Sequence, residues 1–286
     1  MPVDKISVSG DPRIEYKTAT LNGRNYSYIL SQPQSGQYKA TVILIHGFPD
    51  LSMGWRYQIP LFVDMGLRVV APDCLGYGRT LVSHLFTVCV PYAAPTKKDV
   101  SLEDMVRTVT PHFGYQLQLK SGDLEKVIRS KEEISQFLLA LYGGRTEKGA
   151  FGFDVSKGVD VDKIGALKIS RLLSEEELDF YSNEFARSGV HGPLNWYRTR
   201  KVNYQDELEI LDRPQIGVPT LFIQALRDQA LPAHLGKSMA KHVPRLTLKQ
   251  VDTAHWALWE KPDEVNDILA TWLKDQVFAE GRAGKL

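Results

Sequence analysis

The spacing of apolar residues predicts strands at both ends of the chain and helices in the middle. The segments 14–19 and 26–30 alternate between apolar and polar residues on either side of Asn22-Gly23, which is typical of a β-hairpin. Residues at helical spacing predict helices near 57–65 and after the last strand. Strands alternating with helices favour an α/β fold with a mostly parallel sheet. Apolar runs at 40–46 and 85–90 indicate buried strands, and 67–71 is a further apolar strand. The strand pattern returns at 220–224 and 246–251.

The middle of the chain is predicted to form a helical region inserted into the α/β core. Ser130 with Glu133 and Ser174 with Glu177 have the spacing of capping boxes, and each pair precedes apolar residues on one helical face. A length of 286 residues also favours one domain with an insertion. The expected parts are an N-terminal core segment, a helical cap (lid) and a C-terminal core segment, at 1–90, 91–205 and 206–286.

Composition argues against several kinds of partner and location. The 35 Lys and Arg and 34 Asp and Glu give a net charge of +1, so no long-range field attracts nucleic acid or an anionic membrane. No apolar run is long enough to span a bilayer, and residues 1–10 lack the apolar core of a secretory signal. Cys74 and Cys89 lack metal-ligand spacing, so we expect buried thiols in a reducing compartment. We expect a cytoplasmic location, with peroxisomal import as an alternative because residues 284–286 (Gly284-Lys285-Leu286) differ at one position from Ser-Lys-Leu.

Two short motifs have the sequence context of a hydrolase site. His255 follows the predicted strand 246–251 and precedes a helix, as the late histidine of many hydrolases does. An earlier glycine-containing turn follows the predicted strand 40–46, so its backbone N–H groups could face an oxyanion. Between such a turn and such a histidine, hydrolases carry a Gly-x-nucleophile-x-Gly elbow, and this sequence has none. The residues of the turn are His46-Gly47-Phe48-Pro49.

Over nearly its whole length, the chain resembles the α/β-hydrolase-fold epoxide hydrolases. The resemblance implies an α/β-hydrolase fold with a helical cap, and the addition of water to an epoxide to give a vicinal diol without a metal or organic cofactor. Three of the motifs are shared by several hydrolase families, and the two tyrosine motifs are the specific ones. The motifs are H-G-F-P-D at 46–50, G-W-R-Y-Q-I-P at 54–60, A-P-D-C-L-G-Y-G-R-T at 71–80, S-H-L-F-T-V-C-V-P-Y at 83–92, G-Y-Q-L-Q at 114–118, L-N-W-Y-R at 194–198, A-L-R-D at 225–228 and A-H-W at 254–256.

The resemblance also implies roles for individual residues. In the family a carboxylate on the elbow attacks the epoxide and forms an alkyl-enzyme ester, which water then cleaves. By position, Tyr115 and Tyr197 match the tyrosines that donate hydrogen bonds to the epoxide oxygen. His255 matches the base that activates water, and Asp228 matches the acid that orients this base. The alternatives are half-buried tyrosines with hydroxyls in water, a structural histidine and a turn or capping aspartate.

Two aromatic residues near the glycine turn are candidates for the pocket. Phe48 lies where a backbone donor of the oxyanion hole belongs, and its ring is expected to line the pocket. Trp55 fits either a pocket wall or the core, and the sequence does not separate these two interpretations.

The sequence departs from the family between Thr80 and Leu81. By the family template, roughly fifty residues that carry the central strand and the nucleophile elbow are absent at this join. No nucleophile remains, because Asp73, Asp99 and Cys74 are not poised to replace it. A buried strand contributes on the order of 10 kcal/mol, and a domain has only about 5–15 kcal/mol in total. We therefore expect an inactive or nearly inactive chain whose fold is weakened.

Two other classes of function remain open. The chain could be a non-catalytic ligand-binding homologue that retains a cap pocket, or another α/β hydrolase such as a haloalkane dehalogenase or an esterase. Tyr115 with Tyr197 argues against the last two, because halide release needs Trp- or Asn-type donors and ester cleavage needs a serine. The expected ligand is a small apolar epoxide, and the sequence does not specify an oligomeric state.

Overall fold

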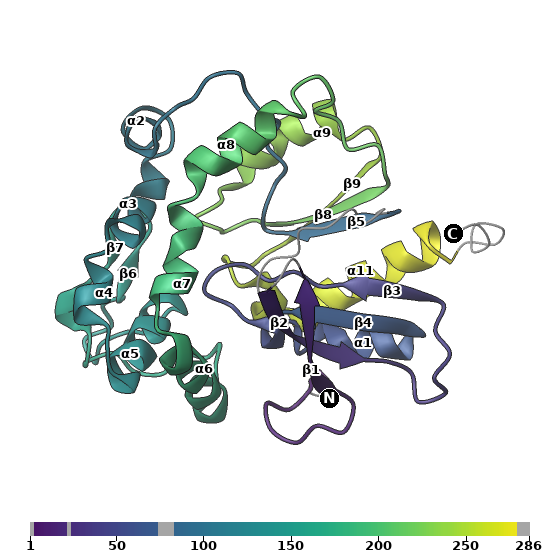
Figure 1. The fold of residues 1–286 in the computed structure, drawn as a ribbon, viewed down its shortest axis with the longest axis horizontal. Helices are drawn as coiled ribbons and strands as arrows, with labels where there is room; N and C mark the ends of the chain where they lie inside the picture. The colour runs from purple at the N-terminus through teal and green to yellow at the C-terminus, as the bar shows by residue number, and fades with distance from the viewer. Residues whose placement is uncertain (1–2, 22–23, 74–82, 279–286) are drawn as a thin grey trace. The chain divides into compact units, whose positions relative to one another are not determined.

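The computed structural model describes residues 3–21, 24–73 and 83–278, shown as the coloured ribbon in Figure 1. Contacts divide the chain into two compact units. Unit 1 comprises Met1–Pro91, Ile216–Asp228 and Ala233–Leu286, and unit 2 comprises Tyr92–Gln215 with Gln229–Pro232.

The first sheet of unit 1 has the strand order β1-β2-β4-β3. Strands β1 (Glu15–Leu21) and β2 (Arg24–Ser31) are antiparallel, which confirms the predicted hairpin, although its Asn22-Gly23 turn lies outside the described residues. Strand β2 pairs antiparallel with β4 (Leu67–Pro72), and β3 (Ala40–Ile43) pairs parallel with β4.

The second sheet of unit 1 contains three parallel strands in the order β5-β8-β9. They are β5 (Leu85–Val88), β8 (Thr220–Ala225) and β9 (Leu246–Val251). Every residue of β8 is buried, because this strand is paired on both sides. Its run of apolar residues without alternation is the pattern expected for a central parallel strand.

Helices of unit 1 pack apolar faces into its core. In α11 (Pro262–Gln276) the residues Val265, Leu269, Trp272 and Leu273 are buried, as their helical spacing predicts. Proline at the start of α11 and acidic residues in its first turn favour that helix end. The remaining helices of unit 1 are η1 (Ser52–Trp55), α1 (Gln58–Asp64), η5 (Ala233–Ser238), α9 (Met239–His242) and α10 (Ala257–Glu260).

Strands β3 and β5 each lie at the end of a sheet, and within the described residues no ladder joins them (Figure 1). The prediction that 40–46 and 85–90 are buried strands is therefore wrong in part. The strands end at Ile43 and Val88, and Ile43, Ile45 and Val90 are 49 %, 50 % and 56 % exposed. A strand at a sheet edge is covered from fewer directions than a central strand, so its apolar side chains stay more accessible.

Unit 2 is mainly helical. Both predicted capping boxes are present, because Ser130 and Ser174 accept from the backbone N–H groups of Glu133 and Glu177, whose side chains accept in return. A two-stranded antiparallel sheet was not predicted, since strands of two residues leave no alternation to detect. The elements are α2 (Leu102–Thr108), η2 (Pro111–Phe113), α3 (Gly114–Ser121), α4 (Leu124–Val127), α5 (Lys131–Leu141), β6 (Phe153–Asp154), β7 (Gly158–Val159), η3 (Val161–Lys163), α6 (Glu175–Ser188), α7 (His191–Leu194), η4 (Asn195–Tyr197) and α8 (Arg200–Leu208).

Among the helices of the described chain, none combines the length and the hydropathy that crossing a bilayer requires.

The position of β3 predicts uneven protection of backbone amides from hydrogen exchange. The N–H of Leu44 donates to the Val70 carbonyl at 3.0 Å, and because successive residues of a strand point to opposite sides, the N–H of Ile43 points away from β4. We expect this amide to exchange roughly a hundredfold faster than that of Ile223 in the central strand β8, as measured by NMR. Equal protection of the two amides would mean that another segment pairs with β3.

Candidate active site

The pairing of β8 with β9 brings Asp228 and His255 together in unit 1. Both residues follow the carboxyl ends of adjacent parallel strands, where polar side chains meet at one sheet edge. Backbone pairing continues past the strands, since Leu226 N–H donates to the Val251 carbonyl and Arg227 N–H donates to the Thr253 carbonyl, both at 2.9 Å. The sequence thus fixes both side chains through the register of one pair of strands.

A short hydrogen bond joins the two side chains. The distance from His255 Nδ1 to Asp228 Oδ2 is 2.7 Å, and the Asp228 side chain is fully inaccessible while that of His255 is 35 % exposed. A buried carboxylate on Nδ1 favours the tautomer with the proton on that nitrogen, which leaves Nε2 as the basic atom. The arrangement can therefore take a proton from a water molecule and stabilise the resulting imidazolium.

Glu260 holds the loop that carries His255, a role that sequence analysis missed. Its carboxylate accepts from the backbone N–H groups of Ala254, at 2.9 Å, and Trp256, at 3.2 Å. The thiol of Cys89 donates to the His255 carbonyl at 3.1 Å. Glu260 lies five residues beyond the histidine, and a carboxylate at the end of a short helix has no sequence signal that separates it from a surface residue.

The glycine turn lies in unit 1 after β3. His46 is buried, its Nδ1 lies 2.9 Å from the Gly47 carbonyl, and the Phe48–Pro49 peptide bond is cis. Trp55 is only 7 % exposed and its ring meets that of Phe86 edge-on, with centroids 6.0 Å apart. This packing supports the core interpretation of Trp55, whereas the oxyanion and pocket roles of 46–49 stay predictions.

The side chain of Asp50 lies too close to Gly54 to leave room for a Cβ atom. A Cβ atom on Gly54 would lie 1.8 Å from Asp50 Oδ2, so no larger residue fits without moving that carboxylate. Trp259 donates its indole N–H to the Gly54 carbonyl at 2.8 Å. The close approach explains the glycine in the 54–60 motif.

In unit 2, the structure places Tyr115 beside Tyr197. Tyr115 lies in the first turn of α3 and Tyr197 at the end of η4, and their rings meet edge-on with centroids 5.9 Å apart. The ring of Phe153 also lies edge-on to Tyr115, at 5.5 Å. Two residues that are 82 positions apart in the sequence therefore form a pair of phenols, which can donate two hydrogen bonds to a single acceptor.

The phenol of Tyr197 stays protonated over the whole neutral range. Burial raises its pKa well above the usual value near 10, and the adjacent Tyr115 raises that pKa further. A protonated phenol is a hydrogen-bond donor, and it has a proton to give to an oxygen that gains negative charge. The tyrosine pair belongs to unit 2 and the His255–Asp228 pair to unit 1.

Two of the sequence predictions concern positions outside the described residues. They are the buried thiol of Cys74 and the missing segment at the join between Thr80 and Leu81. Cys89 is described, and burial, followed by the negative charge of Asp228, raises the pKa of its thiol to about 12. Because the thiolate is the nucleophilic form, Cys89 is not an activated nucleophile.

Several known proteins with similar sequences are epoxide hydrolases. The chain is 34 % identical to epoxide hydrolase srdG of Neurospora crassa over 331 aligned positions, covering 92 % of this chain and 96 % of that protein. It is 29 % identical to bifunctional epoxide hydrolase 2 of Mus musculus, of which it spans about half, 51 %. No family model matches the chain.

Solved structures agree on the fold. Epoxide hydrolases from Vigna radiata and Mycobacterium thermoresistibile superpose with TM-scores of 0.73 and 0.71, at 18 % and 21 % identity. The aligned regions cover 93 % and 91 % of this chain, and 99 % and 98 % of those chains. These likenesses confirm the predicted α/β-hydrolase fold. With the relationship to the Neurospora crassa protein, they show that the chain belongs to the α/β-hydrolase-fold epoxide hydrolases.

The raised pKa of Cys89 predicts a thiol that resists alkylation in the folded protein. At about pH 8 the folded state keeps the thiol protonated, whereas in the unfolded chain, with a pKa near 8.5, an appreciable fraction is thiolate. We expect peptide mass spectrometry to find Cys89 unmodified by iodoacetamide in native protein and modified in urea, with native reactivity rising only toward pH 12. Rapid native modification would contradict this protonation state.

Proposed function

We propose that the site residues of this chain descend from those of an enzyme that adds water to small epoxides with apolar substituents. The observation that carries the proposal is the 2.7 Å contact between His255 and a fully buried Asp228 at adjacent strand ends. In this proposal unit 2 is the cap, and its Tyr115 and Tyr197 bind the epoxide oxygen. The turn at 46–49 supplies the oxyanion site. A cytoplasmic location is part of the proposal and rests on composition alone, since residues 284–286 lie outside the described residues.

Each proposed group assists one step of the reaction. An epoxide carbon opens readily only when its oxygen receives hydrogen bonds or a proton as the C–O bond breaks, and the two phenols supply these donors. The ester formed with a carboxylate is then cleaved by water, from which His255 takes a proton while Asp228 stabilises the imidazolium. Dividing the hydration into two displacements lowers the barrier of each one.

We further propose that this chain lacks the carboxylate that performs the first displacement. The alignment with the Neurospora crassa protein spans 331 positions and covers 92 % of this chain, about 263 of its 286 residues, so roughly 68 aligned positions have no counterpart here. Two other observations support a missing central segment. Neither β3 nor β5 has a second neighbour within the described residues, and Ile43 and Ile45 of the β3 segment are half exposed.

Loss of the nucleophile is expected to lower kcat strongly. Residues of a catalytic group act as a unit, so removing the nucleophile costs several orders of magnitude in kcat even when the other groups stay in place. We expect purified chain to form no diol from styrene oxide above the uncatalysed rate, as measured by chromatography. Robust diol formation that is lost on His255→Gln would contradict the inactivity and show that another residue serves as nucleophile.

Restoring the missing segment tests the proposed roles. A chain carrying the corresponding segment of the Neurospora crassa protein between Thr80 and Leu81 is expected to hydrate styrene oxide. Tyr115→Phe or Tyr197→Phe should lower kcat at least about tenfold, and both together should abolish activity, because each phenol donates to the same oxygen. His255→Gln should leave the ester uncleaved, so that mass spectrometry detects it.

A matched control in the same unit is Tyr204→Phe, since the Tyr204 hydroxyl donates to the Lys97 carbonyl at 2.9 Å at an exposed position. Full activity of the variant with Phe at both 115 and 197 would refute the assignment of the tyrosines.

A further inference from the structure

Helix α3, which carries Tyr115, is fixed to the small sheet of unit 2. The side chain of Gln118 donates from Nε2 to the Val159 carbonyl and accepts from the Val159 N–H at Oε1, both at 2.7 Å. The N–H of Tyr115 donates to the Val155 carbonyl at 3.0 Å. A Cβ on Gly158 would lie 2.1 Å from Gln118 Oε1, so the strand and the helix are in close contact. Tyr115 therefore sits on an anchored element.

The segment that carries Tyr197 is made of two short elements. It consists of the four-residue helix α7 and the three-residue turn η4, neither of which has a capping side chain. Leu194 is fully buried and Val190, directly before α7, is 4 % exposed, so apolar contacts set the depth of the segment and leave its rotation to polar contacts. Short helices of this kind are marginal unless tertiary contacts hold them.

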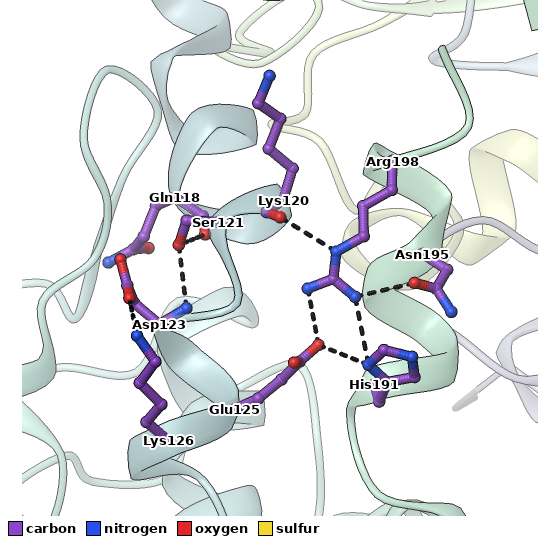
Figure 2. Close-up of polar contacts among 9 residues, drawn as sticks. All are labelled: Gln118, Lys120, Ser121, Asp123, Glu125, Lys126, His191, Asn195 and Arg198. Carbon is purple, nitrogen blue, oxygen red and sulfur yellow. Dashed lines mark hydrogen bonds and ion pairs between the residues drawn. The ribbon is translucent and has the colours of Figure 1, made fainter. Parts of the chain in front are cut away.

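Arg198, directly after Tyr197, ties this segment to α3 and α4 (Figure 2). Its Nε donates to the Lys120 carbonyl at 3.0 Å, in the last turn of α3, and one terminal nitrogen donates to Glu125 Oε1 at 2.7 Å, in α4. The other terminal nitrogen donates to Asn195 Oδ1 at 2.8 Å. The planar guanidinium thus reaches three elements from one position, which a lysine cannot do.

The charges of the cluster favour this arrangement. Burial by itself would raise the pKa of Glu125, but hydrogen bonds from Arg198 and His191 outweigh it and hold that pKa below its usual range. The side chains of Arg198 and Glu125 are 23 % and 25 % exposed, so solvent screens their attraction less than that of a surface pair. His191 Nδ1 lies 3.1 Å from Glu125 Oε1 and adds to the network (Figure 2).

We propose that Arg198 is a positioning residue, which sets the phenol of Tyr197 against that of Tyr115 by joining η4 to the end of α3 and to α4. The inference rests on the proposed role of the tyrosines as paired donors. Arg198 touches no reacting atom in this proposal, and it acts through the 5.9 Å separation of the two rings. Two donors bind one acceptor oxygen well only when their directions are fixed relative to each other.

The test compares Arg198→Gln with Arg187→Gln, which removes an exposed arginine of α6 paired with Glu184 in the same unit. The probe is acetanilide, whose carbonyl oxygen can accept two phenol donors, and its dissociation constant is read from tryptophan fluorescence. Both substitutions are made in the native chain and in the variant with Phe at 115 and 197. Thermal melting checks that each variant is folded.

We expect Arg198→Gln to weaken acetanilide binding about fivefold in the native chain. In the variant without the two phenols the effect should be less than about twofold, because Arg198 then has no phenol to position. Arg187→Gln should change neither. Glu125→Gln, a milder change, should weaken binding in the same selective way, and Arg198→Lys should recover only part of the affinity. Equal weakening with and without the phenols would show a merely structural role and overturn the inference.

A second measurement does not need a ligand. The difference in phenolate absorbance between the native chain and Tyr197→Phe gives the titration of Tyr197, whose pKa burial raises well above its usual value. Arg198→Gln should lower that midpoint by admitting water, and an unchanged midpoint would overturn the inference. If Phe at 115 and 197 leaves acetanilide binding unchanged, or if the native chain does not bind it, the paired-donor role fails. The titration then decides separately whether Arg198 positions Tyr197.

Discussion

Pairing between adjacent parallel strands is the constraint on which this structure depends. It holds β8 and β9 in register from Thr220–Leu246 to Ala225–Val251, and the ladder continues into the loops after both strands. Asp228 and His255 meet only because those loops leave the same sheet edge. A slip of one residue between the two strands would shift one loop relative to the other, so the strand register also sets the geometry of the site.

The same constraint explains the accessible apolar residues at the sheet edges of unit 1. A parallel strand is stable when both of its edges are paired and both of its faces are covered, and β8 meets these conditions. Strands β3 and β5 are paired on one edge only within the described chain, and apolar side chains near their ends stay accessible. The family comparison offers a cause, because the alignment with the Neurospora crassa protein is longer than this chain. The polar pair of each unit is held by contacts within that unit.

Sequence reasoning succeeded where one local pattern decided the structure. The β1–β2 hairpin, the capping boxes at Ser130 and Ser174, and strand β4 follow from alternation, capping residues and an apolar run. Sequence reasoning failed where the burial of a residue depends on neighbouring strands. The exposure of Ile43, for example, depends on which strands flank β3. Glu260 and Arg198 act through backbone groups up to 78 positions away, and no local spacing marks such contacts. The pairing of Asp228 with His255 was predicted only because a family resemblance connected them.

The central claim is that the groups for binding an epoxide and activating water are present in this chain, while the carboxylate that forms the first bond is absent. Intact-mass spectrometry of the purified chain after incubation with styrene oxide tests it most directly, with hydroxylamine to distinguish esters from other adducts. The account predicts no hydroxylamine-labile adduct, even in the His255→Gln variant in which an ester would accumulate. A stoichiometric labile adduct on an aspartate or glutamate side chain would contradict it.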